Sequence, residues 1–134
     1  MSLFHWTADH DVFLPEIDAE HRALFVAGED LHRALSAGAG PDKIKEGMHH
    51  LLQMVEAHFL HEEQLMQVST FESFEWHRTQ HNSVRKRAEA TDPGDALSVT
   101  GLLEYTAGWL RDHTAVADRI MAAHVRNWTR RRAA

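Results

Sequence analysis

Apolar residues recur every three or four positions along most of the chain, and short segments rich in Gly, Pro, Ser and Asp interrupt them. This spacing places apolar side chains on one face of an α-helix, and no stretch alternates with a period of two long enough to indicate a β-strand. The pattern therefore predicts four helices, over residues 18–37, 41–67, 72–89 and 95–127. The segments "SAGAGPD", "VSTFES" and "ATDPGDA" connect them, and an irregular arm precedes Pro15.

Short connections between long helices favour antiparallel neighbours. We therefore predict an all-α fold, an antiparallel up-down-up-down four-helix bundle with an irregular N-terminal arm. The chain has 134 residues, which suits a single core, so residues 1–134 are interpreted as one domain.

Polar residues that can bind metal ions interrupt the apolar stripe of every predicted helix. In the second helix the stripe continues from Val55 into His58 and Glu62. His61 and Glu63 fall off this stripe. The fourth stripe is expected to contain Leu102, Thr106, Trp109, His113, Val116 and Ile120, with Asp118 just beside it. Seven polar residues lie in phase with the four stripes or next to them: His21, His58, Glu62, His77, His81, His113 and Asp118.

These seven residues are expected to meet at one end of the bundle. They lie near the start of the first helix, near the end of the second, at the start of the third and in the later half of the fourth, and neighbouring helices run in opposite directions. A lone histidine on an apolar stripe is usually a core residue with one hydrogen-bond partner. Seven buried polar residues without partners would be costly, and a bound cation would offset that cost.

The donor set restricts the metal. Five imidazoles and two carboxylates exceed the four ligands of a structural zinc site, and magnesium or calcium would require mostly oxygen ligands. A mixed set of nitrogen and carboxylate donors suits iron, manganese or another first-row metal. Seven residues suit two ions, with either carboxylate able to bridge them. The residues alone therefore predict a dinuclear metal site and leave the metal open.

Composition argues against several other classes of protein. The chain has no cysteine, which removes disulfides, thiolate metal sites and cysteine nucleophiles and suits a reducing cytoplasm. The formal net charge of −6 argues against nucleic-acid binding, and the basic "RNWTRRRAA" is interpreted as a solvated tail. No apolar run approaches the ~20 residues of a membrane-spanning helix, and no signal-peptide pattern is present, so we expect no membrane insertion and a cytoplasmic location. Histidine is abundant, with twelve residues.

Motifs around the seven residues resemble those of the hemerythrin family, specifically the single-domain bacteriohemerythrins. The motifs are "LPEIDAEHRALF" around His21, "HFLHEEQLM" with His58 and Glu62, "HRTQH" with His77 and His81, and "WLRDHTAVAD" with His113 and Asp118. The resemblance covers nearly the whole chain, and the residue types agree as well as their spacing does.

The resemblance implies a non-haem di-iron centre, two iron ions with an oxo or hydroxo bridge, that binds dioxygen reversibly for carriage, storage or buffering. By the family's roles, the histidines would be terminal ligands: His77, His81 and His113 on one iron, and His21 and His58 on the other, which keeps an open position for dioxygen. Glu62 and Asp118 would bridge the two ions. In a regular α-helix, the five-residue step from His113 to Asp118 turns Asp118 about 140° away, toward the neighbouring ion.

The resemblance also implies an apolar pocket that keeps water away from the dioxygen site. Its expected lining is Phe59, Trp109, Leu110, Thr114 and Ala117. Family members often carry a bulky aliphatic residue where this chain has Thr114, and Ala117 is likewise small. We therefore predict faster autoxidation than in typical members, and an unchanged oxidation rate in Thr114→Ile would contradict this. Phe13 replaces a usual glycine of the arm.

Three functions are compatible with the sequence. The first is reversible dioxygen binding, the second an oxygen or redox sensor or signalling module, and the third a di-iron redox enzyme such as an oxidase, a peroxidase or a nitric-oxide-handling protein. We favour the first and expect no enzyme, because no spare in-phase carboxylate or tyrosine is available in the core to donate a proton. Tyr105 lies off the fourth stripe. The sequence identifies no protein partner.

The other polar residues are assigned less specific places. Glu63 is interpreted as a surface carboxylate or one that supports a ligand. The remaining histidines are expected at the surface: His5, His10, His32, His49, His50, His61 and His124.

Overall fold

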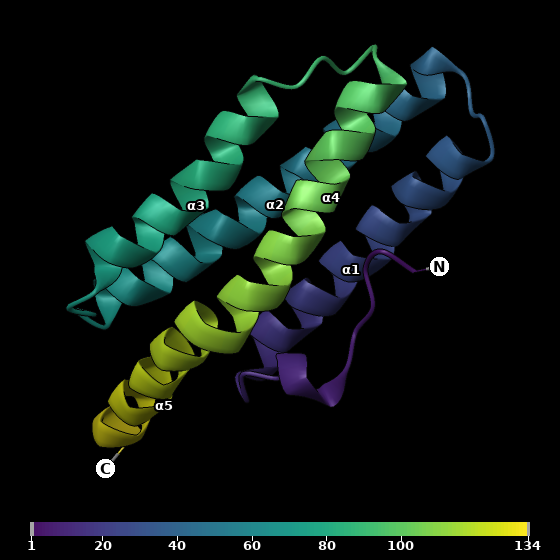
Figure 1. Cartoon of the computed structure of the whole chain (residues 1–134). Coiled ribbons are helices and arrows are strands. Elements are labelled where there is room, and N and C mark those ends of the chain that lie inside the picture. Colours follow the sequence, from purple (N-terminus) through teal and green to yellow (C-terminus); the bar gives the residue numbers. More distant parts are fainter. Residues whose placement is uncertain (1, 134) are drawn as a thin grey trace.

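The computed structural model describes residues 2–133, and all regular structure in that range is helical. A short 3₁₀ helix, η1 (Ala8–His10), lies in the N-terminal arm. Three long helices follow: α1 (Pro15–Ser36), α2 (Pro41–Val68) and α3 (Phe74–Glu89). The last rod consists of α4 (Ala96–His113), the π-helical turn η2 (Thr114–Asp118) and α5 (Arg119–Ala133). Figure 1 shows the antiparallel course of these rods, and the predicted all-α four-helix bundle is confirmed.

The helices begin where the local chemistry favours a first turn. α1 and α2 each begin with a proline, Pro15 and Pro41, whose fixed φ suits the first turn and whose missing N–H is not needed there. α4 begins after Asp95, whose side chain accepts a hydrogen bond from the backbone N–H of Leu97. Proline and aspartate therefore set the start of three of the four rods.

α1 and α2 end in the same type of left-handed turn. Gly38 follows α1 with a φ of 76°, and Thr70 follows α2 with a φ of 54°. In both turns the next residue donates its backbone N–H to the carbonyl oxygen five positions earlier, at 3.0 Å after Gly38 and at 2.9 Å after Thr70. Glycine adopts this conformation freely, whereas a β-branched residue is strained there.

The seven in-phase polar residues lie between apolar clusters. The larger apolar core fills the end of the bundle that holds the α1–α2 turn, and its buried side chains include Leu31, Ile44, Met48, Leu51, Val99, Leu102 and Leu103. Two smaller clusters, one with Ile17 and one with Met66 and Met121, close the other end. Along α1, His21 therefore lies between Ile17 of a small cluster and Leu24 of the large core.

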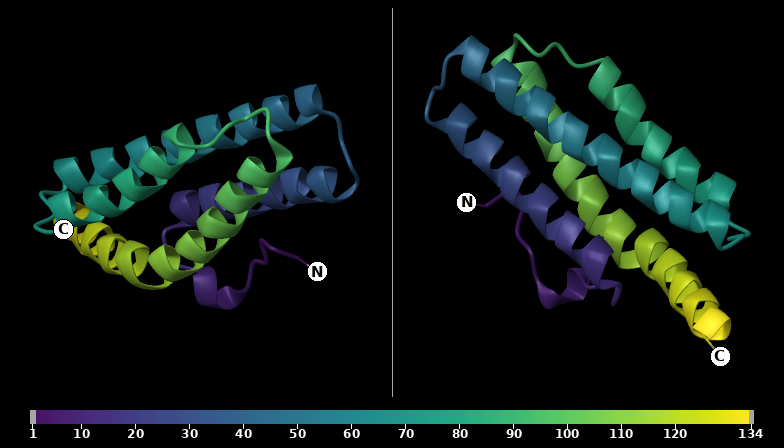
Figure 2. Two further views of the ribbon diagram at one scale, coloured as in Figure 1. Left: turned by 45° about the horizontal axis from the view of Figure 1, so that its top comes forward. Right: turned by 180° about the vertical axis from the view of Figure 1, so that it is seen from behind.

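The N-terminal arm folds back along α1 and reaches the last rod (Figure 2). The backbone N–H groups of Leu3 and Phe4 donate to Glu29 Oε1 at 2.9 and 3.1 Å. Arg119 of α5 donates hydrogen bonds to two backbone carbonyls of the arm, at 2.6 and 3.2 Å. These bonds hold η1 against the π-helical turn.

The π-helical turn changes which side chains of the last rod are buried. Val116 and Ile120, expected in the fourth apolar stripe, are 56 % and 51 % exposed. A π-turn closes i→i+5 hydrogen bonds and so contains about one residue more than an α-helical turn. The buried positions therefore shift by one, to Ala117 and Met121. The expectation for Val116 and Ile120 was wrong because it assumed α-helical spacing throughout.

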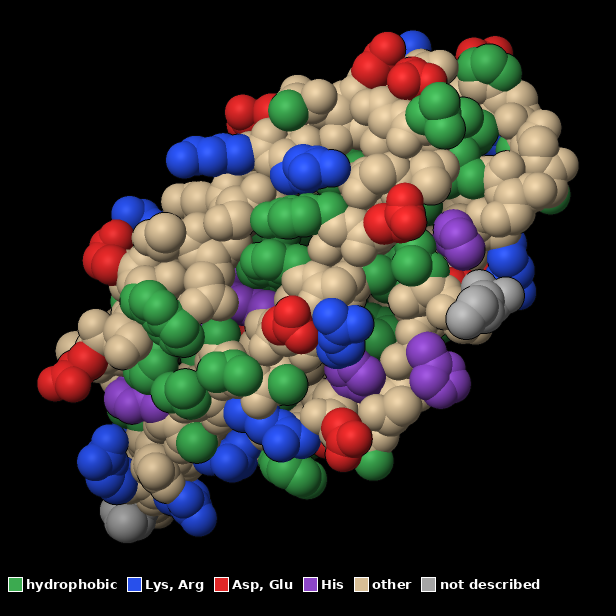
Figure 3. Space-filling view, in the orientation of Figure 1, with side chains coloured by type: hydrophobic (Ala, Val, Ile, Leu, Met, Phe, Trp, Pro, Cys, Tyr) green, Lys and Arg blue, Asp and Glu red, His purple; other side chains and the backbone are tan. Residues whose placement is uncertain are grey.

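The surface is of mixed charge. Figure 3 shows Lys and Arg side chains gathered over α5 near the C-terminal end. The sequence of this helix contains five arginines and no acidic residue, and Arg130, Arg131 and Arg132 are exposed. Within residues 2–133, no helix combines the length and the apolar character needed to cross a membrane.

Candidate metal centre

The structure brings all seven in-phase polar residues together inside the bundle. Each rod contributes: His21 from α1, His58 and Glu62 from α2, His77 and His81 from α3, and His113 and Asp118 from the two ends of the π-turn. Five of them have no exposed surface, and His58 and His113 are only 3 % and 4 % exposed. Their shared level follows from the antiparallel order of the rods, as the sequence predicted.

The two carboxylates divide the five histidines into two groups, because each carboxylate directs one oxygen toward either group. Glu62 Oε1 and Asp118 Oδ1 face a three-histidine group, formed by His77, His81 and His113. Glu62 Oε2 and Asp118 Oδ2 face a two-histidine group, formed by His21 and His58. In each group the donor atoms lie within 4.8 Å of one another, so each group can hold one ion.

In the three-histidine group the Nε2 atoms converge on the two carboxylates. His81 Nε2 lies 3.0 Å from Glu62 Oε1, and His113 Nε2 lies 2.9 Å from Asp118 Oδ1. His77 Nε2 lies between the carboxylates, at 3.3 Å and 3.1 Å from the same two oxygens. The Nε2 atoms of His77 and His113 are themselves 3.0 Å apart. Five donors therefore surround one small volume.

The two-histidine group has fewer donors. His21 Nε2 lies 3.0 Å from Asp118 Oδ2 and 3.5 Å from Glu62 Oε2. His58 Nε2 lies 3.2 Å from Glu62 Oε2. Four residues form this group and five form the other, with both carboxylates shared. An ion in the two-histidine group would therefore have room for a ligand that the protein does not supply.

Hydrogen bonds from Nδ1 orient three of the rings. Each bond is 2.7 Å long and runs from His58 to Glu20 Oε1, from His81 to Glu63 Oε2 and from His113 to Gln80 Oε1. A neutral ring that donates from Nδ1 carries its lone pair on Nε2, the atom that faces the cluster. The protein thus fixes these imidazoles in the form that binds a cation.

The three supporting residues share a feature that is visible in the sequence. Glu20, Glu63 and Gln80 each stand directly beside an inward-facing residue of their own helix, and each supports a histidine of the next helix along the chain. A neighbour of an inward residue is rotated by about 100° and so faces the seam between helices. A polar residue beside an inward-facing one can therefore be predicted to hydrogen-bond a histidine of the neighbouring helix. The sequence analysis did not make this prediction for Glu20 and Gln80.

Glu63 is held from two sides. It is 8 % exposed, accepts the bond from His81 and accepts a further one from Arg85 Nη1 at 2.9 Å. Arg85 also donates to Glu56 at 2.7 Å, and its guanidinium lies 5.2 Å from the centre of the Phe59 ring. This chain of contacts fixes the orientation of His81 from the surface inward.

The π-turn places Asp118 differently from the α-helical expectation. Five residues make about one full turn of a π-helix, so His113 and Asp118 face the same way, with the 2.9 Å contact between them. The expected rotation of about 140° between them assumed an α-helix, and it is wrong. Asp118 reaches both groups through its two oxygens instead.

In the metal-free protein the carboxylates and imidazoles stabilise each other's charged forms. Burial lowers the pKa of His58, but the charge of Glu62 and hydrogen bonds outweigh burial and raise this pKa to about 10. Burial is also outweighed at His21 and His77, where close contacts with the two carboxylates raise each pKa to about 9. The imidazoles of the cluster hold the pKa values of both carboxylates below the usual range despite burial, mainly His58 for Glu62 and mainly His113 for Asp118. Protons thus supply the positive charge that a cation would replace.

The hydrogen bonding of the cluster is incomplete in a way that fits a metal. Six of its buried atoms have no hydrogen-bond partner: His21 Nδ1 and Nε2, Glu62 Oε2, His77 Nδ1, and Asp118 Oδ1 and Oδ2. Several lie about as close to a neighbour as hydrogen-bonded atoms do, but they are not aligned for a hydrogen bond. Native proteins bury few unpaired polar atoms without a further ligand. Four of these atoms, His21 Nε2, Glu62 Oε2 and the two Asp118 oxygens, converge on the interior of the cluster and suit a cation. The nitrogen and carboxylate donors suit a first-row transition metal.

Comparison with known proteins agrees with this geometry. The family described as "Hemerythrin HHE cation binding domain" matches residues 12–125, a range that contains all seven residues. The chain belongs to the hemerythrin family. It is 23 % identical over 125 residues to a bacteriohemerythrin of Clostridium acetobutylicum, an alignment that covers 87 % of this chain and 97 % of that protein. It is 27 % identical over 79 residues to a myohemerythrin of Theromyzon tessulatum, covering 59 % of this chain and 60 % of that protein. The resemblance inferred from the motifs is confirmed.

Phe13 occupies the arm position where the hemerythrin pattern led us to expect glycine. Its φ is 62°, in the left-handed region that glycine adopts without strain, and its side chain is 66 % exposed. The guanidinium of Arg126 lies 6.0 Å from the centre of its ring. A glycine is expected at this position because the backbone is left-handed there. In this chain Phe13 adopts the same left-handed conformation.

Aromatic rings cover the three-histidine group of this hemerythrin domain. Phe59 stacks on His81 with ring centres 4.0 Å apart, and Trp109 stacks on His113 with centres 4.1 Å apart. The two aromatic rings meet edge to face at 5.5 Å. The other expected lining residues are buried, with exposed fractions of 3 % or less: Leu110, Thr114 and Ala117.

The arm contributes to the two-histidine side, which the sequence did not predict. The Trp6 ring centre lies 6.4 Å from that of His21. His10, expected at the surface, is 8 % exposed and lies between Trp6 and Phe25, with ring centres 5.2 and 4.9 Å away. The expectation for His10 was wrong because the arm folds back over α1.

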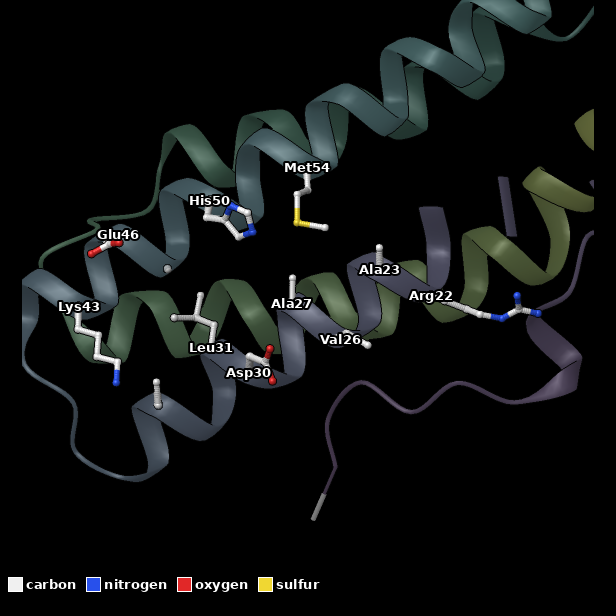
Figure 4. A pocket seen from close by; sticks show the side chains of 12 residues that line it. Arg22, Ala23, Val26, Ala27, Asp30, Leu31, Lys43, Glu46, His50 and Met54 are labelled. Carbon is white, nitrogen blue, oxygen red and sulfur yellow. The ribbon is translucent and has the colours of Figure 1, made fainter. Parts of the chain in front are cut away.

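A groove on the surface of the molecule lies away from the cluster. It has a volume of about 660 Å³ and runs between the outer faces of α1 and α2. Figure 4 shows Ala23, Ala27, Leu31 and Met54 along it. None of the seven cluster residues lines this groove.

Proposed function

We propose that this chain binds two iron ions at the seven clustered residues and binds dioxygen reversibly, for carriage, storage or buffering. The division of the cluster by the two oxygens of each carboxylate supports this function most directly. Glu62 would bridge the ions through Oε1 and Oε2, and Asp118 would bridge them through Oδ1 and Oδ2. Membership of the hemerythrin family supports the same function.

The histidines would be the terminal ligands. His77, His81 and His113 would hold one ion, and His21 and His58 would hold the other. The second ion would have one protein ligand fewer, which leaves a position for dioxygen. When bound, two ferrous ions would supply the electrons that dioxygen takes up.

The donor set favours release of dioxygen over its cleavage. Five imidazoles and two carboxylates give less negative charge than a carboxylate-rich site would. High oxidation states of iron are therefore less stabilised, and the bond between the oxygen atoms is harder to break. Tyr105 packs against the large apolar core, with the guanidinium of Arg87 5.1 Å from its ring centre, and so does not favour an enzyme with a tyrosine proton donor.

The rest of the chain would keep the site rigid and dry. Glu20, Glu63 and Gln80 hold three rings with Nε2 toward the ions, and Arg85 fixes Glu63. Apolar clusters above and below the cluster exclude water. Excluding water and protons slows the loss of electrons to dioxygen that would end reversible binding.

The decisive experiment is an optical titration combined with metal analysis. The purified protein is loaded with iron, analysed for iron per chain, reduced without oxygen, and then exposed to dioxygen and purged in cycles. We expect about two irons per chain, as in other di-iron bundles, and a visible absorption band that appears with dioxygen and disappears on purging. No iron uptake, or one tightly bound zinc ion, would contradict the proposal.

A pair of variants separates the site from the surface. Asp118→Ala removes a bridge and should lower the iron content and abolish the reversible band. Asp112→Ala changes an aspartate of α4 whose side chain is 75 % exposed, and it should change neither. Rapid and irreversible oxidation of the iron-loaded wild type would favour the sensor or the redox enzyme instead. Repeated turnover with an added reductant would then distinguish the enzyme.

A further inference from the structure

Thr114 is the unexpected member of a small set of buried polar atoms. Within the described part of the chain, seven buried side-chain atoms have no hydrogen-bond partner, and six belong to His21, Glu62, His77 and Asp118. The seventh is the hydroxyl oxygen Oγ1 of Thr114, which has no exposed surface. Within residues 2–133, buried side-chain atoms without a hydrogen-bond partner therefore occur only at the candidate metal centre and at this threonine.

Four other hydroxyls, in helices or directly after them, find a partner in the local backbone. Ser69, Thr91, Thr100 and Thr129 donate to the backbone carbonyl four residues earlier, at 2.6 to 2.9 Å. Thr114 makes no such bond, although it follows directly on α4 and its backbone N–H does bond to the carbonyl oxygen of Leu110, four residues earlier. A buried hydroxyl without a partner costs free energy unless a ligand or water completes it.

The position of Thr114 connects it to the metal centre. It is the first residue of the π-turn, directly after His113, and the turn ends at Asp118. Ala117, three residues later in the same turn, is buried and contributes only a methyl group. A hydroxyl can donate one hydrogen bond while it also accepts. A small ligand beside the cluster would thus meet a donor on an otherwise apolar stretch.

We infer that the Thr114 hydroxyl donates a hydrogen bond to the small non-protein ligand of the metal centre and so helps to set the affinity for that ligand. This role rests on the proposed di-iron function. The ligand class is a small molecule or anion with an exposed lone pair and partial negative charge when bound, such as dioxygen or azide. Thr114 acts here as a specificity residue and not as a metal ligand.

The test compares three variants of the iron-loaded protein with azide as the probe. Thr114→Val removes the hydroxyl at nearly constant shape, and Thr114→Ser keeps it. Thr106→Val is the matched control, because Thr106 is a buried threonine of α4 at 5 % exposure. We expect Thr114→Val to bind azide to the oxidised protein about 3- to 10-fold more weakly, the size of one hydrogen bond. Thr114→Ser and Thr106→Val should bind it like the wild type.

Two further readouts do not depend on affinity. The vibrational frequency of bound azide should shift in D₂O for the wild type and not for Thr114→Val. In the metal-free protein, Thr114→Val should unfold at a higher temperature than the wild type, because it removes an unpaired buried hydroxyl. Equal azide affinity and equal D₂O shifts in wild type and Thr114→Val would overturn the role of Thr114.

Failure of the proposed function would look different. A wild-type protein that takes up no iron would contradict the di-iron function and the Thr114 role together. A wild type that takes up two irons and binds dioxygen, while Thr114→Val behaves identically, would contradict only the Thr114 role.

Discussion

The end of the bundle with the α1–α2 turn and the end with the α2–α3 turn bury the same helical faces with different chemistry. The apolar half consists of buried side chains that need no ligand or hydrogen-bond partner. They include Leu31, Ile44, Met48, Leu51, Val99, Leu102 and Leu103. The polar half, with the seven clustered residues, contains six unpaired buried atoms. The large apolar core therefore has no unpaired polar side-chain atoms among its residues, whereas the cluster keeps atoms that a ligand could bind.

The largest expected effect is that bound iron stabilises the polar half by occupying its unpaired donor atoms. Loading both groups should raise the free energy of unfolding by about 4 kcal/mol per ion at free iron 1,000-fold above the dissociation constant. The reason is that the folded cluster binds ions and the unfolded chain does not hold its donors together. Urea unfolding with and without iron under anaerobic conditions measures the effect. Equal midpoints for the two forms would show that the polar half does not bind iron in the folded state.

The next largest effect is expected from a substitution in the apolar half, which should lower the stability of the protein and leave iron binding unchanged. Leu103 has no exposed surface in the apolar half, and Leu103→Ala should lower the free energy of unfolding by about 2–5 kcal/mol through lost burial and a cavity. Iron per chain should remain unchanged, because Leu103 belongs to the apolar core and not to the cluster. Chemical unfolding and metal analysis of the same preparation provide both numbers. A fall in iron content of the folded variant would mean that the two halves are not independent.

The third effect distinguishes the halves by pH. In the metal-free protein, the pKa values of His21 and His77 are raised to about 9 and that of His58 to about 10, from an ordinary value of 6.5. A raised pKa stabilises the folded state fully below pH 6.5, and the contribution is lost as pH rises through 9 to 10. The lowered pKa values of Glu62 and Asp118 stabilise the folded state above the usual carboxyl range, and that contribution is lost in acid.

The metal-free protein should therefore be most stable between the usual carboxyl range and pH 6.5, and should lose stability as pH rises through 9 to 10. The iron-loaded protein should not show this alkaline loss, because metal binding requires neutral imidazoles and releases their protons. Unfolding curves of both forms from pH 5 to 10 test the difference. An alkaline loss of equal size in both forms would place its origin outside the cluster.

The sequence predicted what depends on regular helix geometry. Stripes at spacings of three and four gave the bundle, and the antiparallel order brought His21, His58, His77 and His113 to one level. The π-turn was not predicted, because one additional residue in a turn leaves the apolar residues in place along the sequence and changes only which of them face inward. The exposed Val116 shows this effect directly.

The supports and the arm depend on tertiary contacts. Glu20 and Gln80 are ordinary helix-surface residues until the neighbouring helix places a histidine opposite them. His10 is buried only because the arm folds back over α1, and no periodic pattern in the arm indicates that. Such features require knowledge of which helices are neighbours, which the pattern of a single helix does not contain.

The smallest expected effect concerns the turns that close the two halves. Gly38 closes the apolar half with a φ of 76°, and Thr70 closes the polar half with a φ of 54° in the same hydrogen-bonded turn. A residue with a side chain in this conformation costs about 1–2 kcal/mol, part of which glycine gives back through its greater freedom in the unfolded chain. We therefore expect Thr70→Gly to stabilise the metal-free protein by about 1 kcal/mol.

The reverse change, Gly38→Thr, is the matched control and should destabilise the protein by a similar amount. Apart from Gly38 and its two chain neighbours, no heavy atom lies within 4 Å of the position of a Cβ there, so strain in the backbone and not a clash would cause the loss. Urea unfolding of both variants beside the wild type measures the two changes. Thr70→Gly without a gain, together with Gly38→Thr with a loss, would mean that the threonine is compensated at the polar end. The turn beside the metal centre would then be held by contacts that the turn at the apolar end does not have.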